Sequence, residues 1–230
     1  MNVTVRLQRS IPVLAVSVVL LSGCGVASTQ FHPGVAAQVG DTTITTRHVA
    51  DVTDGYCSAI ESVSEDQPDA QQIPLRYLSH EFTTTLVLEA ATRQLADDYD
   101  VEAGPAYRSA IAAIEPQIAT LSDHEQDSVL AVEGAQAYYQ DVLTQIGGIE
   151  LDDADATDDD KAAAGQKVLQ AWVDDHDIEV NPKYAIEIGS SDQADTDTSF
   201  ALSKSATGGL LAEPDADYTK GLSARLVCGA

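Results

Sequence analysis

The chain has 230 residues, of which 44% are hydrophobic, and it carries 37 acidic but only 12 basic side chains. This length is enough for one domain with its own hydrophobic core, or for two small domains. The formal net charge of −25 excludes binding to the phosphates of nucleic acids, because they repel a polyanion. Solubility is the simplest explanation of the charge, and an acidic recognition surface is the alternative.

An apolar run near the N-terminus ends close to a cysteine. Residues 11–21, IPVLAVSVVLL, follow Arg6 and Arg9 and are followed by small residues and Cys24. The run is too short for a membrane-spanning helix, which needs about 20 residues. Its basic, apolar and small-residue order is typical of a secretory signal peptide. The motif LSGC also resembles the lipobox of bacterial lipoproteins, which implies that residues 1–23 are removed and that Cys24 carries lipid. An ordinary signal peptide, with Cys24 as a spare thiol, is the alternative.

Removal of the signal peptide takes away two arginines and no acidic residue, so the mature formal charge is −27. A protein of this charge is repelled by anionic head groups. The lipid on Cys24 would therefore hold the protein at the extracytoplasmic face of the cell membrane. Residues 24–35 show no periodicity and are predicted to be a lipidated tether.

Two cysteines besides Cys24 are present, Cys57 and Cys228. They form an even pair in an exported compartment that permits disulfides, which predicts a bridge between them. The bridge would close most of the mature chain into one loop, worth about 5 kcal/mol in the chain-entropy model. Two buried free thiols are the alternative.

The first regular elements are predicted between residues 36 and 97. β-favouring residues on both sides of Gly40-Asp41 predict two short strands joined by a turn. Apolar residues at helical spacing predict a helix from residue 46 and a second over residues 73–97. Their apolar positions are Val49, Val52, Tyr56 and Ile60 in the first helix, and Leu75, Leu78, Phe82 and Leu86 in the second.

Three further helices are predicted between residues 104 and 175. Gly104-Pro105 opens the third, and Pro116 predicts a kink or break within it. The S-x-x-E sequence at 122–125 is a capping box for the fourth helix, which Gly147-Gly148 is predicted to end. An acidic loop then leads to a fifth helix over residues 159–175. The apolar positions of these helices are Tyr107, Ile111, Ile114, Ile118, Leu121, Val129, Val132, Tyr139, Val142, Ile146, Val168 and Trp172.

The rest of the chain is less regular. Residues 178–188 are predicted to be extended on both sides of an Asn181-Pro182 turn, with a strand at Tyr184, Ile186 and Ile188. Residues 191–230 are predicted to be an irregular C-terminal segment, linked back by the disulfide. The whole chain is therefore expected to be mainly α with a small β element.

Histidine motifs for metal-dependent catalysis are incomplete. His80-Glu81 and His124-Glu125 begin like the metalloprotease sequence H-E-x-x-H, but Thr84 and Ser128 occupy the position of the second histidine. Each helix face thus lacks one ligand. An unrecognised hydrolase would require His124 or His176 in a deep pocket beside acids from another helix.

The acidic segments also fall short of a metal site. The loop begins like a calcium-binding loop at Asp153 and Asp155, but Asp158 and Ala164 replace its glycine and its bidentate glutamate. The cluster at 174–177 is more typical of a solvated helix end. We therefore predict no metal, no cofactor and no enzymatic activity.

Two short motifs resemble the SurA/PrsA-type extracytoplasmic chaperones. Residues 36–52 resemble the opening of that fold, in which a strand with V-[NG]-[GD]-x-x-I-[ST] enters a helix, and residues 178–188 resemble its return strand with V-x-V-N-P-[RK]-[FY]. The matching positions are Val39, Gly40, Asp41, Ile44, Thr45, Val180, Asn181, Pro182, Lys183 and Tyr184. Ala185-Ile186-Glu187 depart from the glycine and tryptophan that often follow.

The resemblance implies a helical domain over residues 36–190, with a SurA N-terminal or trigger-factor-like peptide-binding fold whose early and late strands pair. Too few residues follow the return motif for the parvulin isomerase domain. The implied function is a non-enzymatic holdase for unfolded exported polypeptides. Without methionines in the mature chain, Tyr138 and Tyr139 are candidate peptide contacts. The alternative is an envelope scaffold, or a lipoprotein that binds one specific folded partner.

Overall fold

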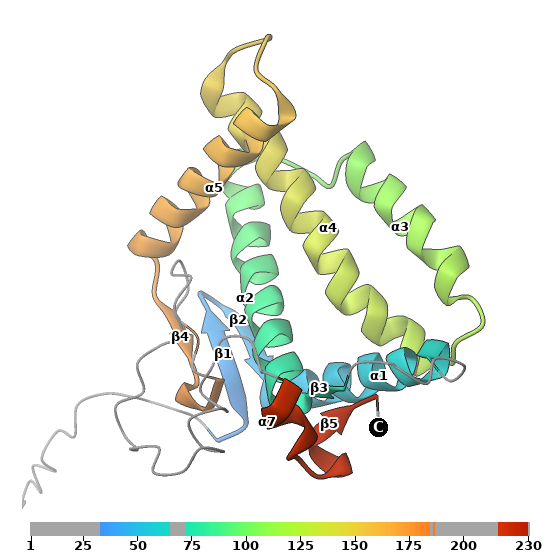
Figure 1. Cartoon of the computed structure of the whole chain (residues 1–230). Coiled ribbons are helices and arrows are strands. Elements are labelled where there is room, and N and C mark those ends of the chain that lie inside the picture. The colour runs from blue at the N-terminus through green and yellow to red at the C-terminus, as the bar shows by residue number, and fades with distance from the viewer. Residues whose placement is uncertain (1–32, 65–71, 185, 187–215, 230) are drawn as a thin grey trace, which may run out of the picture. The chain divides into compact units, whose positions relative to one another are not determined.

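Five long helices make up most of the chain that the structure describes (Figure 1). The computed structural model describes residues 33–64, 72–184, 186 and 216–229, and all of these belong to one unit, residues 31–230. The helices are α1 (Thr46–Ser64), α2 (Leu75–Tyr99), α3 (Pro105–Ile118), α4 (Asp123–Leu151) and α5 (Asp158–Asp175). Together with small antiparallel sheets they confirm the expectation of a mainly helical chain with a small β element.

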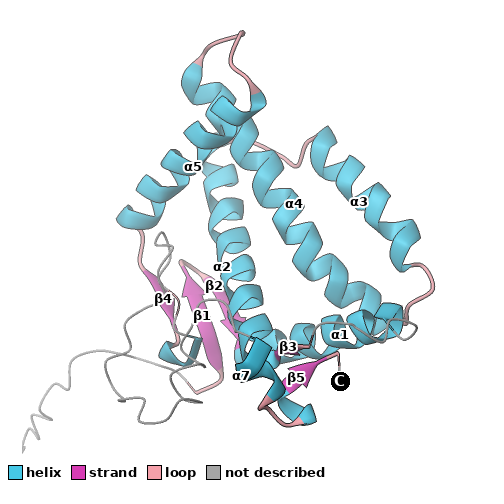
Figure 2. Ribbon diagram, viewed as in Figure 1, coloured by secondary structure: helices cyan, strands magenta, loops and turns pink. Residues whose placement is uncertain are grey.

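A three-stranded antiparallel sheet joins the early and late parts of the unit (Figure 2). Its strands are β1 (Val35–Val39), β2 (Thr42–Thr45) and β4 (Ile178–Val180), in the order β2-β1-β4. β1 and β2 form the predicted hairpin. β1 also pairs with β4, with Ala37 opposite Val180 and Val39 opposite Ile178. The expected pairing of an early strand with a late strand is therefore present.

A second, two-stranded sheet ties the end of the described chain to its first third. β3 (Ile73–Pro74) pairs antiparallel with β5 (Val227–Cys228), which follows α7 (Ala216–Lys220) and η2 (Ala224–Leu226). Local periodicity predicts none of these short elements, and it assigns residues 73–74 to a helix. The pairing arises from a contact between segments distant in sequence, which no local pattern records.

The main core lies where α2, α4 and α5 meet the three-stranded sheet. α4 is the central helix and contacts α1, α2, α3 and α5. The largest side chains that are almost fully buried include Val39 of β1, Val49 of α1, Leu95 of α2, and Leu143 and Ile146 of α4. Apolar stripes at helical spacing meet here because each helix must bury its apolar face against another element.

The end of α4 differs from the prediction. Gly147-Gly148 is predicted to end this helix, but α4 continues to Leu151 and ends at Asp152 in the left-handed region (φ 45°). Gly147 is needed for helix packing instead, because a Cβ there would overlap the carbonyl oxygen of Lys161 on α5. A Cβ on Gly165 of α5 would likewise overlap the carbonyl of Leu143. The two glycines let the backbones of α4 and α5 touch.

The helix starts agree better with the sequence. Ser122 and Glu125 form the predicted capping box of α4. A second capping box, Thr157 with Asp160, begins α5 and was not predicted.

Two further elements differ from the prediction. α3 does not break at Pro116 but continues through it to Ile118. The predicted strand at Tyr184 is a short 3-10 turn, η1 (Pro182–Tyr184), because the Asn181 side chain accepts a hydrogen bond from the Lys183 amide at 3.0 Å.

Several predictions concern residues outside the described part of the chain. These are the signal peptide 1–23, the lipidation of Cys24, most of the tether 24–35, Ile188 and the segment 191–215. Within the described ranges, none of the helices combines the length and the hydropathy that a bilayer crossing requires.

Candidate functional site

The two family-like motifs lie together in the three-stranded sheet. Val39 and Ile44 are buried in the core. Gly40 adopts a positive φ of 53° in the turn between β1 and β2, a conformation that favours glycine. The early motif positions thus build a hairpin that leads directly into α1, which begins at Thr46.

Asn181 fastens the late motif to the hairpin. Its backbone amide donates to the Ala36 carbonyl at 2.8 Å, and its side-chain amide donates to the Val35 carbonyl at 3.0 Å. Tyr184 is buried, and its carbonyl accepts a hydrogen bond from Nδ1 of His80 at 2.7 Å. The late motif therefore closes the sheet and links it to α2. His80, a candidate metal ligand by its motif, has this structural contact.

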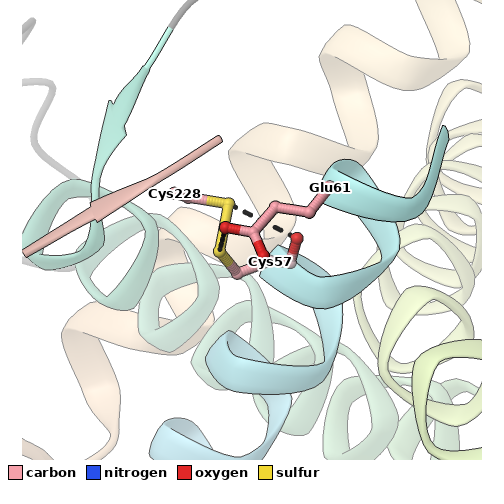
Figure 3. A group of neighbouring side chains, drawn as sticks. All are labelled: Cys57, Glu61 and Cys228. Carbon is pink, nitrogen blue, oxygen red and sulfur yellow. Dashed lines mark hydrogen bonds between the residues drawn. A yellow bond between two sulfur atoms is a disulfide. The ribbon is translucent and has the colours of Figure 1, made fainter. Parts of the chain in front are cut away.

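The predicted disulfide between Cys57 and Cys228 is present, and it joins α1 to β5 (Figure 3). The two Cα atoms lie 5.5 Å apart, within the range usual for disulfides. Cys228 is fully buried and Cys57 is 8% exposed. The bridge spans 171 positions of sequence, so it ties the end of the described chain to the first long helix.

Glu61 lies beside the bridge, one helical turn after Cys57. Its Oε1 atom is 3.7 Å from the Cys57 sulfur (Figure 3). The same atom accepts a hydrogen bond from the Gly229 amide at 3.2 Å. A disulfide sulfur has no proton, so the first distance is a contact rather than a hydrogen bond. Cys57, Glu61 and Cys228 have the proximity of metal ligands, but the sulfurs are bonded to each other and only the carboxylate is left to coordinate.

A satellite apolar cluster surrounds the bridge, which we call the C-terminal cluster. Tyr56 and Phe82 are in ring contact within it, with centroids 4.8 Å apart. The Tyr56 hydroxyl donates to Glu133 at 2.6 Å, and burial together with this carboxylate raises the pKa of Tyr56. The cluster comprises buried Val52, Cys57, Leu78, Phe82, Val132 and Cys228, and half-buried Tyr56, Ile60, Ile73, Leu75 and Ala131.

The two candidate tyrosines differ in exposure. Tyr138 is buried, with the Arg93 guanidinium 4.3 Å above its ring and the edge of Tyr107 against it. Its ring therefore offers little surface to a peptide in this conformation. Tyr139 is half-buried against the core, and burial raises its pKa. Of the pair, Tyr139 is the one with free surface.

The other histidine and acidic motifs lie apart from one another. His124 is exposed, and its neighbour Glu125 serves the capping box, where hydrogen bonds from Ser122 lower the pKa of the carboxyl. His176 stacks on Trp172 at 3.8 Å and donates from Nδ1 to the Trp172 carbonyl. Asp153 accepts a hydrogen bond from the Asp155 amide within the acidic loop. Glu125, His176 and Asp153 thus each make a local structural contact.

An open depression of about 920 Å³ lies beside the first half of α1. Its described lining is mainly polar and charged, and includes Arg47, His48, Asp51 and Asp54. It is not an apolar groove of the kind that a peptide-holding protein needs. Large apolar side chains that are exposed in the described residues are Val63, Ile149, Leu151 and Leu226.

Comparison of the chain with protein-family models, with curated proteins and with solved structures finds no match.

Proposed function

We propose that this protein is a lipid-anchored extracytoplasmic chaperone, which holds unfolded exported polypeptides without a chemical reaction. The observation that carries the proposal is the sheet in which the two SurA/PrsA-like motifs meet. Val39 of the early motif pairs with Ile178, two residues before Val180 of the late one, and all five long helices lie between them in sequence. This is the chain order that the resemblance implies for a SurA N-terminal-like fold.

Apolar surface that is only partly covered supports a holding function. Five residues of the C-terminal cluster are half-buried, and so are Tyr139 of α4 and the α3 residues Tyr107, Ile111 and Ile114. An unfolded client exposes apolar side chains that would gain free energy by contact with such surface, at about 25 cal/mol per Å² removed from water. No nucleotide or metal enters this mechanism.

The holding function can be tested by light scattering. A chemically unfolded, aggregation-prone protein is diluted into buffer that contains residues 25–230 at increasing ratios. We expect suppression of aggregation near equimolar amounts without ATP. An equally acidic protein that does not bind unfolded chains is the matched control, because charge alone can slow aggregation. Equal scattering with both proteins would refute the proposal.

The anchor has a separate test. Cys24→Ser should move the protein from the membrane fraction to the soluble fraction, and the mass that the lipid adds to the protein should be lost. Cys57→Ser should change neither the fraction nor the lipid mass. A Cys24→Ser protein that stays in the membrane fraction, with no lipid on the unsubstituted protein, would refute lipidation.

A scaffold that binds one folded partner is the second candidate. It is favoured by the α4–α5 hairpin, where exposed Ile149 and Leu151 lie close to the acidic loop at the end of two helices in backbone contact. A rigid end with two apolar side chains suits a specific partner better than many clients. Recovery of one stoichiometric protein with the intact chain, but not with an Ile149→Asp/Leu151→Asp variant, would favour this function.

A further inference from the structure

The last part of the described chain, residues 216–229, has few buried side chains. Of these residues Thr219, Val227 and Cys228 are buried, and most of the others are exposed. As a strand the segment pairs with Ile73 and Pro74 of β3, and Tyr218 and Thr219 make further contacts. Its last described residue, Gly229, is held by the Glu61 carboxylate, and Cys228 is held by the disulfide. The covalent part of this attachment is the single disulfide.

The segment covers apolar surface where it is attached. Val227 is 4% exposed and Cys228 is fully buried, and Cys228 belongs to the C-terminal cluster. Beside them Ile60, Ile73 and Leu75 are already half-buried. Departure of β5 would uncover these three side chains further, together with the unpaired edge of β3.

We propose that residues 216–229 are a latch on a client-binding surface, and that this surface takes an extended apolar segment of an unfolded polypeptide in place of β5. The inference rests on the proposed chaperone function and assigns a site to it. The chain's own strand shows the binding mode: an extended segment adds antiparallel to β3, with Val227 opposite Pro74 and Cys228 opposite Ile73. Two consecutive side chains of the client would fill the space of Val227 and Cys228.

Opening requires reduction of the bridge by a dithiol. One thiolate of the dithiol attacks a sulfur of the Cys57–Cys228 bond and forms a mixed disulfide with that cysteine. The second thiolate of the dithiol then attacks the mixed disulfide and releases the cysteine. Two electrons pass to the cysteines, two protons complete their thiols, and the dithiol leaves as a disulfide. Since the cysteines are 8% and 0% exposed, the attack needs prior lifting of β5. The bridge is therefore reduced slowly, through the fraction of molecules in which β5 is lifted.

Glu61 links re-formation of the disulfide to the seating of β5. Its carboxylate lies 3.7 Å from the Cys57 sulfur in the closed state. It also receives the Gly229 amide only when β5 is seated. A client that occupies β3 would keep Gly229 away from Glu61 and hold the latch open.

The test measures peptide binding to residues 25–230, which contain every described element. A fluorescein-labelled, extended apolar peptide flanked by lysines is titrated into the oxidised protein, into protein reduced with a dithiol, and into a Cys57→Ala/Cys228→Ala variant. We expect at least tenfold tighter binding to the second and third samples than to the first, with unchanged far-ultraviolet circular dichroism. The double variant should not respond to the dithiol.

Two results would overturn the latch. Equal affinity of oxidised and reduced protein would show that the segment does not block the site. Loss of helical dichroism on reduction would show that the disulfide holds the whole unit together, so that residues 216–229 are no separable cover.

Matched variants of α1 locate the site. Ile60→Asp, at a half-buried position of the C-terminal cluster, should abolish the gain on reduction. Val63→Asp, at a position 61% exposed on the same helix, should leave the gain intact. Equal effects of the two substitutions would place the peptide elsewhere. Suppression of aggregation that is the same in oxidised and reduced protein would refute the latch but keep the chaperone function, whereas absence of suppression in both would remove the function itself.

Discussion

The α4–α5 hairpin and residues 216–229 are fastened to the protein by opposite means. The hairpin is held by close packing, in which Gly147 and Gly165 bring two helix backbones into contact. The C-terminal segment is held by a two-residue strand and one disulfide, with Glu61 as the acceptor for the Gly229 amide, and it also buries Thr219. Packing cannot be released without separating the helices, whereas a covalent bond can be cut by a reductant. The C-terminal segment is therefore suited to move, and the hairpin is not.

The largest expected effect comes from Gly147→Ala. The added Cβ would overlap the Lys161 backbone, so α4 and α5 must separate, and we expect a loss of about 3 kcal/mol in the free energy of unfolding. Gly148→Ala is the matched control, because its Cβ would meet only the Lys161 side chain at 3.5 Å or more. The control should gain about 0.5–1 kcal/mol from helix propensity. Urea unfolding measures both, and equal effects would contradict tight hairpin packing.

A gain in stability is expected from Thr92→Val in α2. The Thr92 hydroxyl is buried and has no hydrogen-bond partner among the described residues. Valine has nearly the same shape without the polar atom, so the free energy of unfolding should rise by about 1 kcal/mol. Thr83→Val is the control, since the Thr83 hydroxyl donates to the Ser79 carbonyl at 2.6 Å and would lose that bond. If Thr83→Val stabilises the protein as much, the orphan hydroxyl is not the cause.

A smaller, local loss is expected from Glu61→Ala in the oxidised protein. The Gly229 amide loses its acceptor, and hydrogen exchange there should become roughly fivefold faster, which corresponds to about 1 kcal/mol. Glu61→Gln keeps an acceptor oxygen and should remain closer to the unsubstituted protein. Unchanged exchange at Gly229 in Glu61→Ala, by mass spectrometry of C-terminal fragments, would show that the carboxylate does not hold the segment.

The smallest effect concerns the capping boxes at low pH. Hydrogen bonds from Ser122 lower the pKa of Glu125 below 4.5, and those from Thr157 lower the pKa of Asp160 below 3.8. A lowered pKa in the folded state means that the carboxylate stabilises the protein above the unfolded pKa and that this stability is lost as pH falls through the folded pKa. As the pH falls below 4, the melting temperature of a Glu125→Gln/Asp160→Asn variant should therefore drop slightly less than that of the unsubstituted protein. A parallel drop in both proteins would refute the capping contribution.

Helical periodicity predicted much of the fold because it is a local property. The spacing of Val49, Val52 and Ile60 identified α1, and the S-x-x-E sequence located the start of α4 at Ser122. The same reasoning misread Gly147, since a glycine that ends a helix and a glycine that lets another helix approach look alike in sequence. Pairing of Ile73 with Cys228 had no local signal, and the even number of remaining cysteines predicted the bridge from Cys228 to Cys57 but not this strand.

For the candidate site, the residues established which chemistry is available and the fold established where it lies. Two cysteines in a chain that is expected to be exported predict a bridge, because thiols outside the cytoplasm oxidise in pairs. The crossing of α1, α2 and α4 decides three features of the site. It places Glu61 beside the bridge, it places the C-terminal cluster next to the bridge, and it buries Tyr138. The angle at which helices cross depends on many contacts between segments distant in sequence, such as the backbone contact at Gly147 and Gly165. No single stretch of sequence determines it.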